Sequence, residues 1–410
     1  MMTEHRQKLV PEIRFKGFTN AWEQRRLSTI IHLFNGNSFS SKGAQVTGIR
    51  WLKISNVSVG KIDWTESSYL PKEFWDHFES YRLGPGDYVM ALTRPVLKNE
   101  LKVARINDSH ALLNQRVAKL MFEQDAGFGF QLLRKRDTVD AITNAISGTD
   151  PPNLSAKDFE KVSVVIPSIE EQKKIGEFFE SLDNLITLHK RKLDGLVTLK
   201  DGFLQQMFPA GDEVMPRVRF AGFTGNWEER RLGEMLTERN EQFEESEDYP
   251  LMSFVGNVGV VPKGEQYDRS FLVKGDDKKY KKTELNDFIY SSNNLETGSI
   301  GLNRTGKAVI SPVYSIFYSS NDSESLFVGL LSKRKDFINK MIHYRQGVMY
   351  GQWRIHERDF LKIIVLTPTI SEQNRIIDFF KNIDEQIAAQ TAKLKQLRQL
   401  KVAYLQRMFI

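Results

Sequence analysis

The chain has 410 residues, of which 40% are hydrophobic and 27% charged, and its formal net charge is +6. These values are typical of a folded protein with two or three domains, and they exclude a largely disordered chain. The lack of cysteine excludes disulfides and thiolate zinc sites, and neither a bilayer-spanning apolar run nor a secretory signal is present. We therefore expect a cytoplasmic protein that contacts no membrane, with a charge compatible with a polyanionic partner.

Two parts of the chain recur in the same order. Residues 11–22 reappear as residues 216–227, and each copy continues into Arg-Arg-Leu. A second match relates residues 158–208 to 359–409 through an Asp-Phe pair, a proline, Glu-Gln, Phe-Phe, an Asp and Met-Phe. Between these ends, residues 49–130 share little with residues 251–328 beyond strand-like runs and an aligned Asp87 and Asp287. A duplicated frame around different middles suits a protein with two unlike recognition surfaces.

Apolar residues at alternating spacings of four and three predict two long helices with heptad seams, each beginning shortly after Pro167 or Pro368. Lys200 and Lys401 occupy the same seam position in the two copies. Parallel packing would bring these lysines together, so an antiparallel pair is favoured, with the lysine stems directed outward. The seam residues are Ile175, Phe179, Leu182, Ile186, Leu193, Leu196, Ile376, Phe380, Ile383, Ile387, Leu394 and Leu397.

A second seam position is polar in both copies, with His189 in the first helix and Gln390 in the second. We interpret His189 as a tolerated seam residue without a catalytic role. Because a helix rises 1.5 Å per residue, each rod would be roughly 50 Å long, longer than one DNA turn of about 34 Å. Domains at its ends could therefore straddle a spacer.

The segments between the repeated ends are predicted to form short strands followed by helical stretches. Strands are predicted at residues 51–54, 84–90, 117–122, 251–255, 287–290 and 313–318, and helical stretches at 130–147 and 326–344. The predicted class is α+β, with two mixed α/β domains separated by two long helices packed as an antiparallel coiled coil in an internal pseudo-twofold repeat. The predicted limits are 1–165 and 210–367 for the domains, and 166–209 and 368–410 for the helices.

Loops around these strands carry side chains suited to DNA, since Arg and Lys can contact guanine or phosphate and Asn and Gln can contact adenine. An ordinary solvated loop residue is the alternative at each position. The candidates in the first domain are Arg94, Lys98, Asn114, Gln115, Arg116, Ser147 and Thr149. Those in the second are Lys278, Lys279, Asn293, Asn294, Arg304, Lys307, Tyr350, Gln352 and Arg354.

Catalytic patterns are incomplete in this sequence. Asp150-Pro-Pro-Asn153 is similar to the Asp/Asn-Pro-Pro-aromatic motif of adenine methyltransferases, but its aromatic residue is missing, so a turn is the better interpretation. No glycine-rich phosphate loop is present, and the acidic residues 244–248 lack a His or Lys partner at a spacing typical of metal-dependent cleavage. We therefore predict no catalytic residue, metal ligand or cofactor in this chain.

The repeated Pro-x-x-Arg-Phe-x-Gly-Phe…Trp segments and Pro-x-x-x-Glu-Gln…Phe-Phe…Asp…Met-Phe helices resemble the specificity subunits of type I restriction-modification enzymes. The resemblance implies two target-recognition domains that each read half of a split site in double-stranded DNA, with the helices setting the spacer. By position, Asn114-Gln115 and the Ser147-Gly148 turn fall where that family's first domain approaches DNA, whereas the second domain departs from the Asn-Gln pattern.

The resemblance also implies partners. Two modification (methyltransferase) subunits, which bind S-adenosylmethionine, would clasp the helices, and we assign the seam residues to this contact as well. Restriction subunits using ATP and Mg²⁺ would join them. The alternative to this interpretation is a non-catalytic coiled-coil scaffold whose domains bind proteins, with a self-contained DNA-modifying enzyme less favoured.

Overall fold

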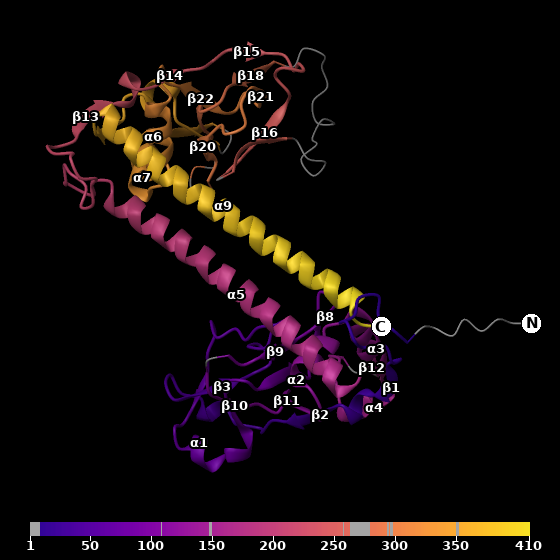
Figure 1. Cartoon of the computed structure of the whole chain (residues 1–410). Coiled ribbons are helices and arrows are strands. Elements are labelled where there is room, and N and C mark those ends of the chain that lie inside the picture. Colours follow the sequence, from indigo (N-terminus) through magenta and orange to yellow (C-terminus); the bar gives the residue numbers. More distant parts are fainter. Residues whose placement is uncertain are drawn as a thin grey trace, which may run out of the picture. The chain divides into compact units, whose positions relative to one another are not determined.

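The computed structural model describes residues 9–107, 109–146, 150–256, 258–262, 279–292, 295, 298–349 and 352–410. The chain divides into two compact units: unit 1 comprises Met1–Lys190 with Ala392–Ile410, and unit 2 comprises Arg191–Thr391. Each unit combines helices with short strands (Figure 1), so the predicted α+β class is confirmed. The domain limits stay predictions. In the described part of the chain, no helix is both long and apolar enough to cross a bilayer.

Among the described residues, short strands and four short α-helices form the globular part of unit 1. Its helices are α1 (Phe74–His77), α2 (Ala126–Leu132), α3 (Arg136–Ala145) and α4 (Ala156–Lys161), followed by the long α5 (Ile169–Gln206), which continues into unit 2. Its strands are β1 (Glu23–Arg26), β2 (Ile31–Asn35), β3 (Ile49–Leu52), β4 (Tyr69–Leu70), β5 (Arg82–Leu83), β6 (Tyr88–Ala91), β7 (Val96–Leu97), β8 (Glu100–Leu101), β9 (Val103–Arg105), β10 (Ala111–Leu113), β11 (Val117–Phe122) and β12 (Ser163–Ile166).

Unit 2 repeats this arrangement. Its helices are α6 (Ser323–Leu331), α7 (Lys335–His343), α8 (Glu357–Phe360) and the long α9 (Ile370–Arg407), which ends in unit 1. Its strands are β13 (Glu228–Arg231), β14 (Thr237–Glu238), β15 (Gln242–Phe243), β16 (Met252–Val255), β17 (Gly259–Pro262), β18 (Tyr280–Thr283), β19 (Phe288–Tyr290), β20 (Ile300–Leu302), β21 (Ala308–Ile310), β22 (Ser315–Tyr318), β23 (Gln346–Met349), β24 (Gln352–Arg354) and β25 (Ile364–Thr367).

The two units share a four-stranded antiparallel sheet of the same connectivity, ordered β2-β11-β6-β9 in unit 1 and β14-β22-β19-β20 in unit 2. Its second and third strands are buried on both faces. Met90 of β6 and Tyr290 of β19 face one hydrophobic cluster in their units, while Val89 and Ile289 face another. The alternating side chains of a strand explain why a continuous apolar run serves two cores.

The aligned Asp87 and Asp287 each order the turn before one of these strands. The backbone amide of Gly84 donates to Oδ2 of Asp87 at 2.9 Å, and the amide of Glu284 donates to Oδ2 of Asp287 at 2.7 Å. Each carboxylate also pairs with a cation, Lys119 at 2.8 Å and Arg239 at 2.8 Å. The shared aspartate is therefore structural.

The repeated motif residues build the frame of each unit. Arg14 donates to both carboxylate oxygens of the buried Glu171, at 2.6 and 2.7 Å. Arg219 makes the same two contacts with Glu372, also at 2.6 and 2.7 Å. This bidentate geometry anchors the segment before each domain to the first turn of a long helix.

The repeated tryptophans complete this frame. In unit 1 the buried Trp22 packs edge-on against Phe409, with ring centroids 6.2 Å apart. In unit 2 Trp227 packs against Phe208 in the same way, at 5.9 Å. The Met-Phe pair at the end of each long helix thus closes the core of a domain, which is why it recurs.

The long helices pair antiparallel within each unit. Figure 1 shows α5 and α9 running in opposite directions. In unit 1, Phe178 of α5 contacts Tyr404 of α9, with ring centroids 5.0 Å apart. Lys401, which precedes Tyr404 on α9, pairs with Asp183, which follows Phe178 on α5. In unit 2 the ring of Phe203 on α5 lies 4.9 Å from that of Phe379 on α9. The predicted antiparallel coil is confirmed.

The seam lysines differ from the prediction. Lys401 is buried and lies 2.6 Å from Oδ2 of Asp183, and Lys200 pairs with Asp384 in the same way. The predicted outward course of these stems is therefore wrong. Each opposing helix supplies a carboxylate, so the ammonium group remains paired without reaching bulk water.

The seam residues also pack within the chain itself. Eight of them are buried and so expose little surface to another subunit: Ile175, Phe179, Leu182, Ile376, Phe380, Ile383, Leu394 and Leu397. The other four are half-buried: Ile186, Leu193, Leu196 and Ile387. A partner would have to contact other faces of the helices.

Each of the two predicted helical stretches is a pair of helices, because Lys135 and Arg334 are extended between them. Lys135 donates to the carbonyl of Ile410, beyond the end of α9. Arg334 donates to the carbonyls of Leu204 and Pro209, at 2.6 and 3.0 Å, near the end of α5. The break in each pair thus places a cation on carbonyl groups at the end of a long helix, where it is favourable.

Candidate nucleic-acid interface

Three segments of unit 1 meet at the end of β6. The amide of Leu92 donates to the carbonyl of Arg116 at 2.9 Å, and the amide of Arg94 donates to the carbonyl of Pro152 at 2.8 Å. Thr93 and Asn153 form an isolated β-bridge. The end of the segment Asp150-Pro-Pro-Asn153 therefore pairs through its backbone with residues 92–94. Ser147 and Thr149 lie outside the described residues.

Basic side chains gather around this junction. Arg94 and Arg116 are exposed, and Lys98 lies at the tip of the β7–β8 hairpin. Lys98 and Asn99 have positive φ values of 51° and 62°, as a two-residue hairpin turn requires, and so the tip has a defined backbone. The sequence candidates Arg94, Lys98 and Arg116 thus lie on loops that the β6 region orders.

Lys102 was not a candidate but belongs to the same region. Burial, and then the positive charge of Arg94, lower the pKa of Lys102. Among the described residues, no carboxylate forms an ion pair with Arg94, Lys98, Lys102 or Arg116. An unneutralised group of this kind favours phosphate, which accepts hydrogen bonds from Arg and Lys.

The side chains of Asn114 and Gln115 differ in whether they are available to contact DNA. The side-chain oxygen of Asn114 accepts from the amide of Arg116 at 3.2 Å, so it orders its own loop. Gln115 is exposed, and its amide donates to the carbonyl of Asn37 at 2.9 Å. Gly36 permits this close packing, because a Cβ there would lie 2.3 Å from the carbonyl oxygen of Asn114.

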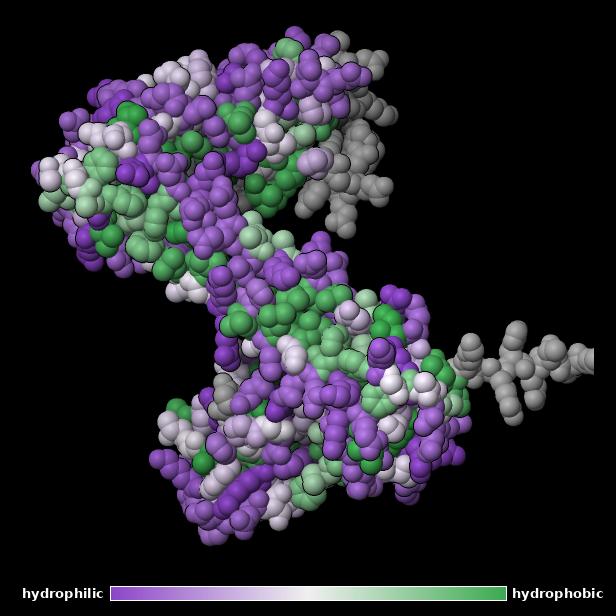
Figure 2. All heavy atoms as spheres, in the orientation of Figure 1, coloured by the Kyte–Doolittle hydropathy of each residue, from purple (hydrophilic) through white to green (hydrophobic). Residues whose placement is uncertain are grey.

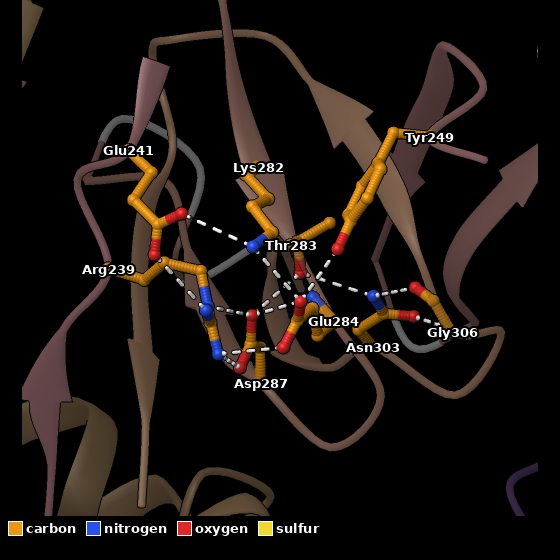
Figure 3. Close-up of polar contacts among 9 residues, drawn as sticks. All are labelled: Arg239, Glu241, Tyr249, Lys282, Thr283, Glu284, Asp287, Asn303 and Gly306. Atoms are coloured by element: carbon orange, nitrogen blue, oxygen red, sulfur yellow. Dashed lines mark hydrogen bonds and ion pairs between the residues drawn. The ribbon is translucent and has the colours of Figure 1, made fainter. Parts of the chain in front are cut away.

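In unit 2 the loop between β20 and β21 carries Arg304 and Lys307, and the buried Asn303 orders it (Figure 3). Oδ1 of Asn303 accepts from the amides of Thr305 and Gly306, at 2.9 and 3.1 Å. Its Nδ2 donates to the carbonyl of Gly306 at 2.7 Å. Asn303 was not among the predicted site residues, although Asn followed by Gly three residues later is typical of a turn.

Charged residues next to this loop form a network of ion pairs (Figure 3). Arg239 pairs with Asp287 at 2.8 Å, and Lys282 pairs with Glu241 and Glu284 at 3.2 Å each. Burial raises the pKa of Asp287, and Arg239 opposes that rise. Burial lowers the pKa of Lys282, but hydrogen bonds to the two glutamates outweigh it and raise the value. Every charged group in this network thus has a partner of opposite sign within the domain, and the network supports the loop.

The structure describes some of the remaining candidate residues of unit 2 and not others. Lys279 is exposed before β18, and Arg354 is exposed on β24, 3.9 Å from Glu357. The neighbouring Trp353, which the prediction did not select, is 46% exposed, and the guanidinium of Arg345 lies 5.9 Å from its ring. Gln352 belongs to β24. Lys278, Asn293, Asn294 and Tyr350 lie outside the described residues.

Comparison with known proteins agrees with the repeat. The sequence matches the family described as the type I restriction modification DNA specificity domain twice, over residues 20–197 and 224–399. It is 30% identical to the specificity subunit of the type I restriction enzyme MjaVIII of Methanocaldococcus jannaschii over 184 residues, which are 44% of this chain and 43% of that subunit. It is 37% identical to the EcoAI specificity subunit of Escherichia coli over 100 residues, or 24% and 17% of the two chains. These matches therefore span less than half of either relative.

A solved structure resembles the whole chain. The S subunit of a type I restriction-modification system from M. genitalium has a TM-score of 0.65 and 14% identity, covering 98% of this chain and 99% of that one. At this identity the likeness concerns the fold. The double family match carries the assignment: this chain belongs to the family of type I restriction-modification DNA specificity domains, of which it contains two copies.

Proposed function

We propose that this chain is the sequence-reading subunit of a type I restriction-modification complex. Unit 1 would read one half of a split target in double-stranded DNA, and unit 2 would read the other half. The observation that carries the proposal is the cationic junction of unit 1, where Arg94, Lys98 and Arg116 project from loops without a described carboxylate partner. Such a surface binds phosphate, while neighbouring side chains contact base edges.

The two units share a frame but differ in their loops, which supports the recognition of two distinct half-sites. Both units repeat the Arg–Glu anchor, the buried tryptophan and the central sheet. Their loops differ: unit 1 offers the β7–β8 hairpin with Lys98, whereas unit 2 offers the Asn303 turn with Arg304 and Lys307. One frame that presents unlike loops favours recognition of unlike sequences.

The outer faces of the helices suit a protein partner. Figure 2 shows hydrophobic residues over the middle of α5, where Leu188 is 63% exposed. In unit 2 a groove of about 430 Å³ is lined by residues of both helices, among them Leu199, Phe203 and Phe379. Exposed apolar surface of this kind marks interaction sites. We assign it to the two modification subunits, in place of the buried seam residues.

Chemistry would then belong to other subunits. We propose that the modification subunits bind S-adenosylmethionine, that restriction subunits use ATP and Mg²⁺, and that this chain holds none of these. In the described residues, no three His, Asp or Glu side chains gather as a metal site would require. Calorimetric titration of the purified chain with S-adenosylmethionine tests this division, and heat of specific binding to this chain alone would contradict it.

The deciding experiment is to co-express the chain with its modification subunit, supply S-adenosylmethionine, and map methylated adenines in a randomised DNA library. A split motif with a fixed spacer is expected. Exchanging residues 31–150 for those of another family member should change one half of the motif only. If a stable complex forms without methylation, although the modification subunit is active with another specificity chain, a scaffold role is favoured instead.

A further inference from the structure

Two cations contact one carboxylate, and a third cation lies near it, where the second globular domain meets the helices of unit 2. Lys200 of α5 pairs with Asp384 of α9, and Nζ of Lys333, just after α6, lies 3.7 Å from the other oxygen of Asp384. Arg304, from the loop between β20 and β21, forms no ion pair with Asp384 but is near enough for its charge to lower the pKa of Lys333. Lys200, Lys333 and Arg304 carry three positive charges, whereas Asp384 carries one negative charge.

Unit 1 builds the same frame without an excess of charge. Lys401 pairs with Asp183, and Nη1 of Arg134 lies 3.8 Å from that carboxylate. Arg134 follows α2 as Lys333 follows α6. Here the β7–β8 hairpin supplies Glu100, whose negative charge acts on Lys401. Two positive charges therefore face two negative ones.

The two clusters also differ in access to solvent. In unit 1 the side chains of Lys401 and Arg134 are 7% and 19% exposed. In unit 2 the side chain of Lys333 is 39% exposed, and Arg304 is exposed as well. The uncompensated charge of unit 2 can therefore be reached from outside.

Excess positive charge is unfavourable in the isolated chain. Burial, and then the charge of Lys200, lower the pKa of Lys333 to about 8, with Asp384 opposing and Arg304 adding to the decrease. An anion bound by Lys333 and Arg304 would relieve this repulsion. The oxygens of a phosphate group accept hydrogen bonds from both types of side chain.

We propose that Arg304 and Lys333 bind a phosphate group of the DNA backbone beside the half-site read by unit 2, while Lys200 holds Asp384 in place. The proposal rests on the proposed function. A backbone phosphate is favoured over a free phosphate ion because Arg304 shares its loop with the exposed Lys307, so the basic surface continues beyond the cluster. The buried Asn303, which orders that loop, would fix the phosphate contact and the neighbouring base contacts together.

The test measures binding of the full chain to a fluorescent duplex at several salt concentrations. In the double variant Arg304→Gln/Lys333→Met, the slope of log K against log salt should fall by about 1, which corresponds to roughly tenfold weaker binding at 0.1 M salt. The loss should be the same for all sequences, since a phosphate contact carries no sequence information. Lys333→Arg, which keeps the charge, should restore most of the affinity lost by Lys333→Met.

Arg134→Met is the matched control, because it alters the equivalent position of unit 1 and should leave the slope unchanged. Circular dichroism and the unfolding midpoint establish that each variant is folded. If the wild type binds duplex DNA but the folded double variant retains its affinity and slope, the phosphate site is refuted. If the wild type shows no salt-dependent DNA affinity, the proposed function itself fails.

Inorganic phosphate, added at constant ionic strength, distinguishes the two sources of the anion. We expect it to change the unfolding midpoints of the wild type and the double variant equally. A stabilisation confined to the wild type, combined with unchanged DNA binding by the variant, would assign the site to free phosphate and overturn the proposal.

Discussion

The ammonium group of Lys401 lies 2.6 Å from Oδ2 of Asp183, across the antiparallel helices of unit 1. Lys200 and Asp384 repeat the contact in unit 2. Because each pair joins one residue of α5 to one of α9, it is made only at a single register of the helices. A buried pair can specify register in this way even where it contributes little net stability.

Removing one member of this pair should destabilise unit 1. Asp183→Ala would leave the buried Lys401 without its carboxylate, at an expected cost of about 3 kcal/mol in the free energy of unfolding. The double variant Asp183→Ala/Lys401→Met should recover most of that loss. Urea unfolding followed by circular dichroism measures both. Asp194→Ala, at an exposed position on α5, is the control and should change little. Equal stability of the single variant and the wild type would show that the pair is dispensable.

The same lysine predicts a pH dependence of stability. Burial, and then the charge of Arg134, lower the pKa of Lys401 to about 8, while Asp183 and Glu100 oppose the decrease. Its charged form is therefore disfavoured in the folded chain. Between about pH 8 and the ordinary lysine value near 10.4, the unfolded chain binds the additional proton, so stability rises with pH.

This pH effect is best measured in a Lys333→Met background, since the pKa of Lys333 is also lowered to about 8. As the pH increases from 8 to 10, the unfolding midpoint of Lys333→Met should rise relative to that of the double variant Lys333→Met/Lys401→Met. Parallel curves for the two proteins would contradict a lowered pKa for Lys401.

Arg94 should contribute to DNA affinity through its charge. It has a φ of 48°, a left-handed conformation that Asn tolerates well, so Arg94→Asn removes the charge with little change to the backbone. We expect the salt slope of duplex binding to fall by about 1, uniformly across sequences. Arg136→Asn, at an exposed helical position of the same unit, is the control. A sequence-specific loss would instead assign Arg94 to a base edge.

Gly36 should be required for the first half-site alone. A Cβ at this position would meet the carbonyl oxygen of Asn114 at 2.3 Å, so Gly36→Ala must displace the loop that carries Gln115 and Arg116. In the methylation map, the first half of the motif should become degenerate while the second half is retained. Gly43→Ala, where the space around the new Cβ is open, is the matched control. Loss of both halves would indicate that the substitution unfolds more than this loop.

Local sequence patterns determined the frame of this protein. The heptad spacing predicted the two long helices, and the repeated motifs identified the residues that anchor them, such as Arg14 and Trp22. These features were readable because periodicity and duplication survive in a single sequence. The antiparallel direction followed from the need to keep Lys200 and Lys401 apart.

Only the tertiary structure decided where charges are compensated. The sequence could not show that Asp183 and Asp384 pair with the seam lysines, or that the charged groups around Arg239 pair with one another. It selected Arg304 as one basic loop residue among several, and did not relate it to Lys333. The physical reason is that an electrostatic environment depends on distances between side chains far apart in the chain, which neither composition nor periodicity records.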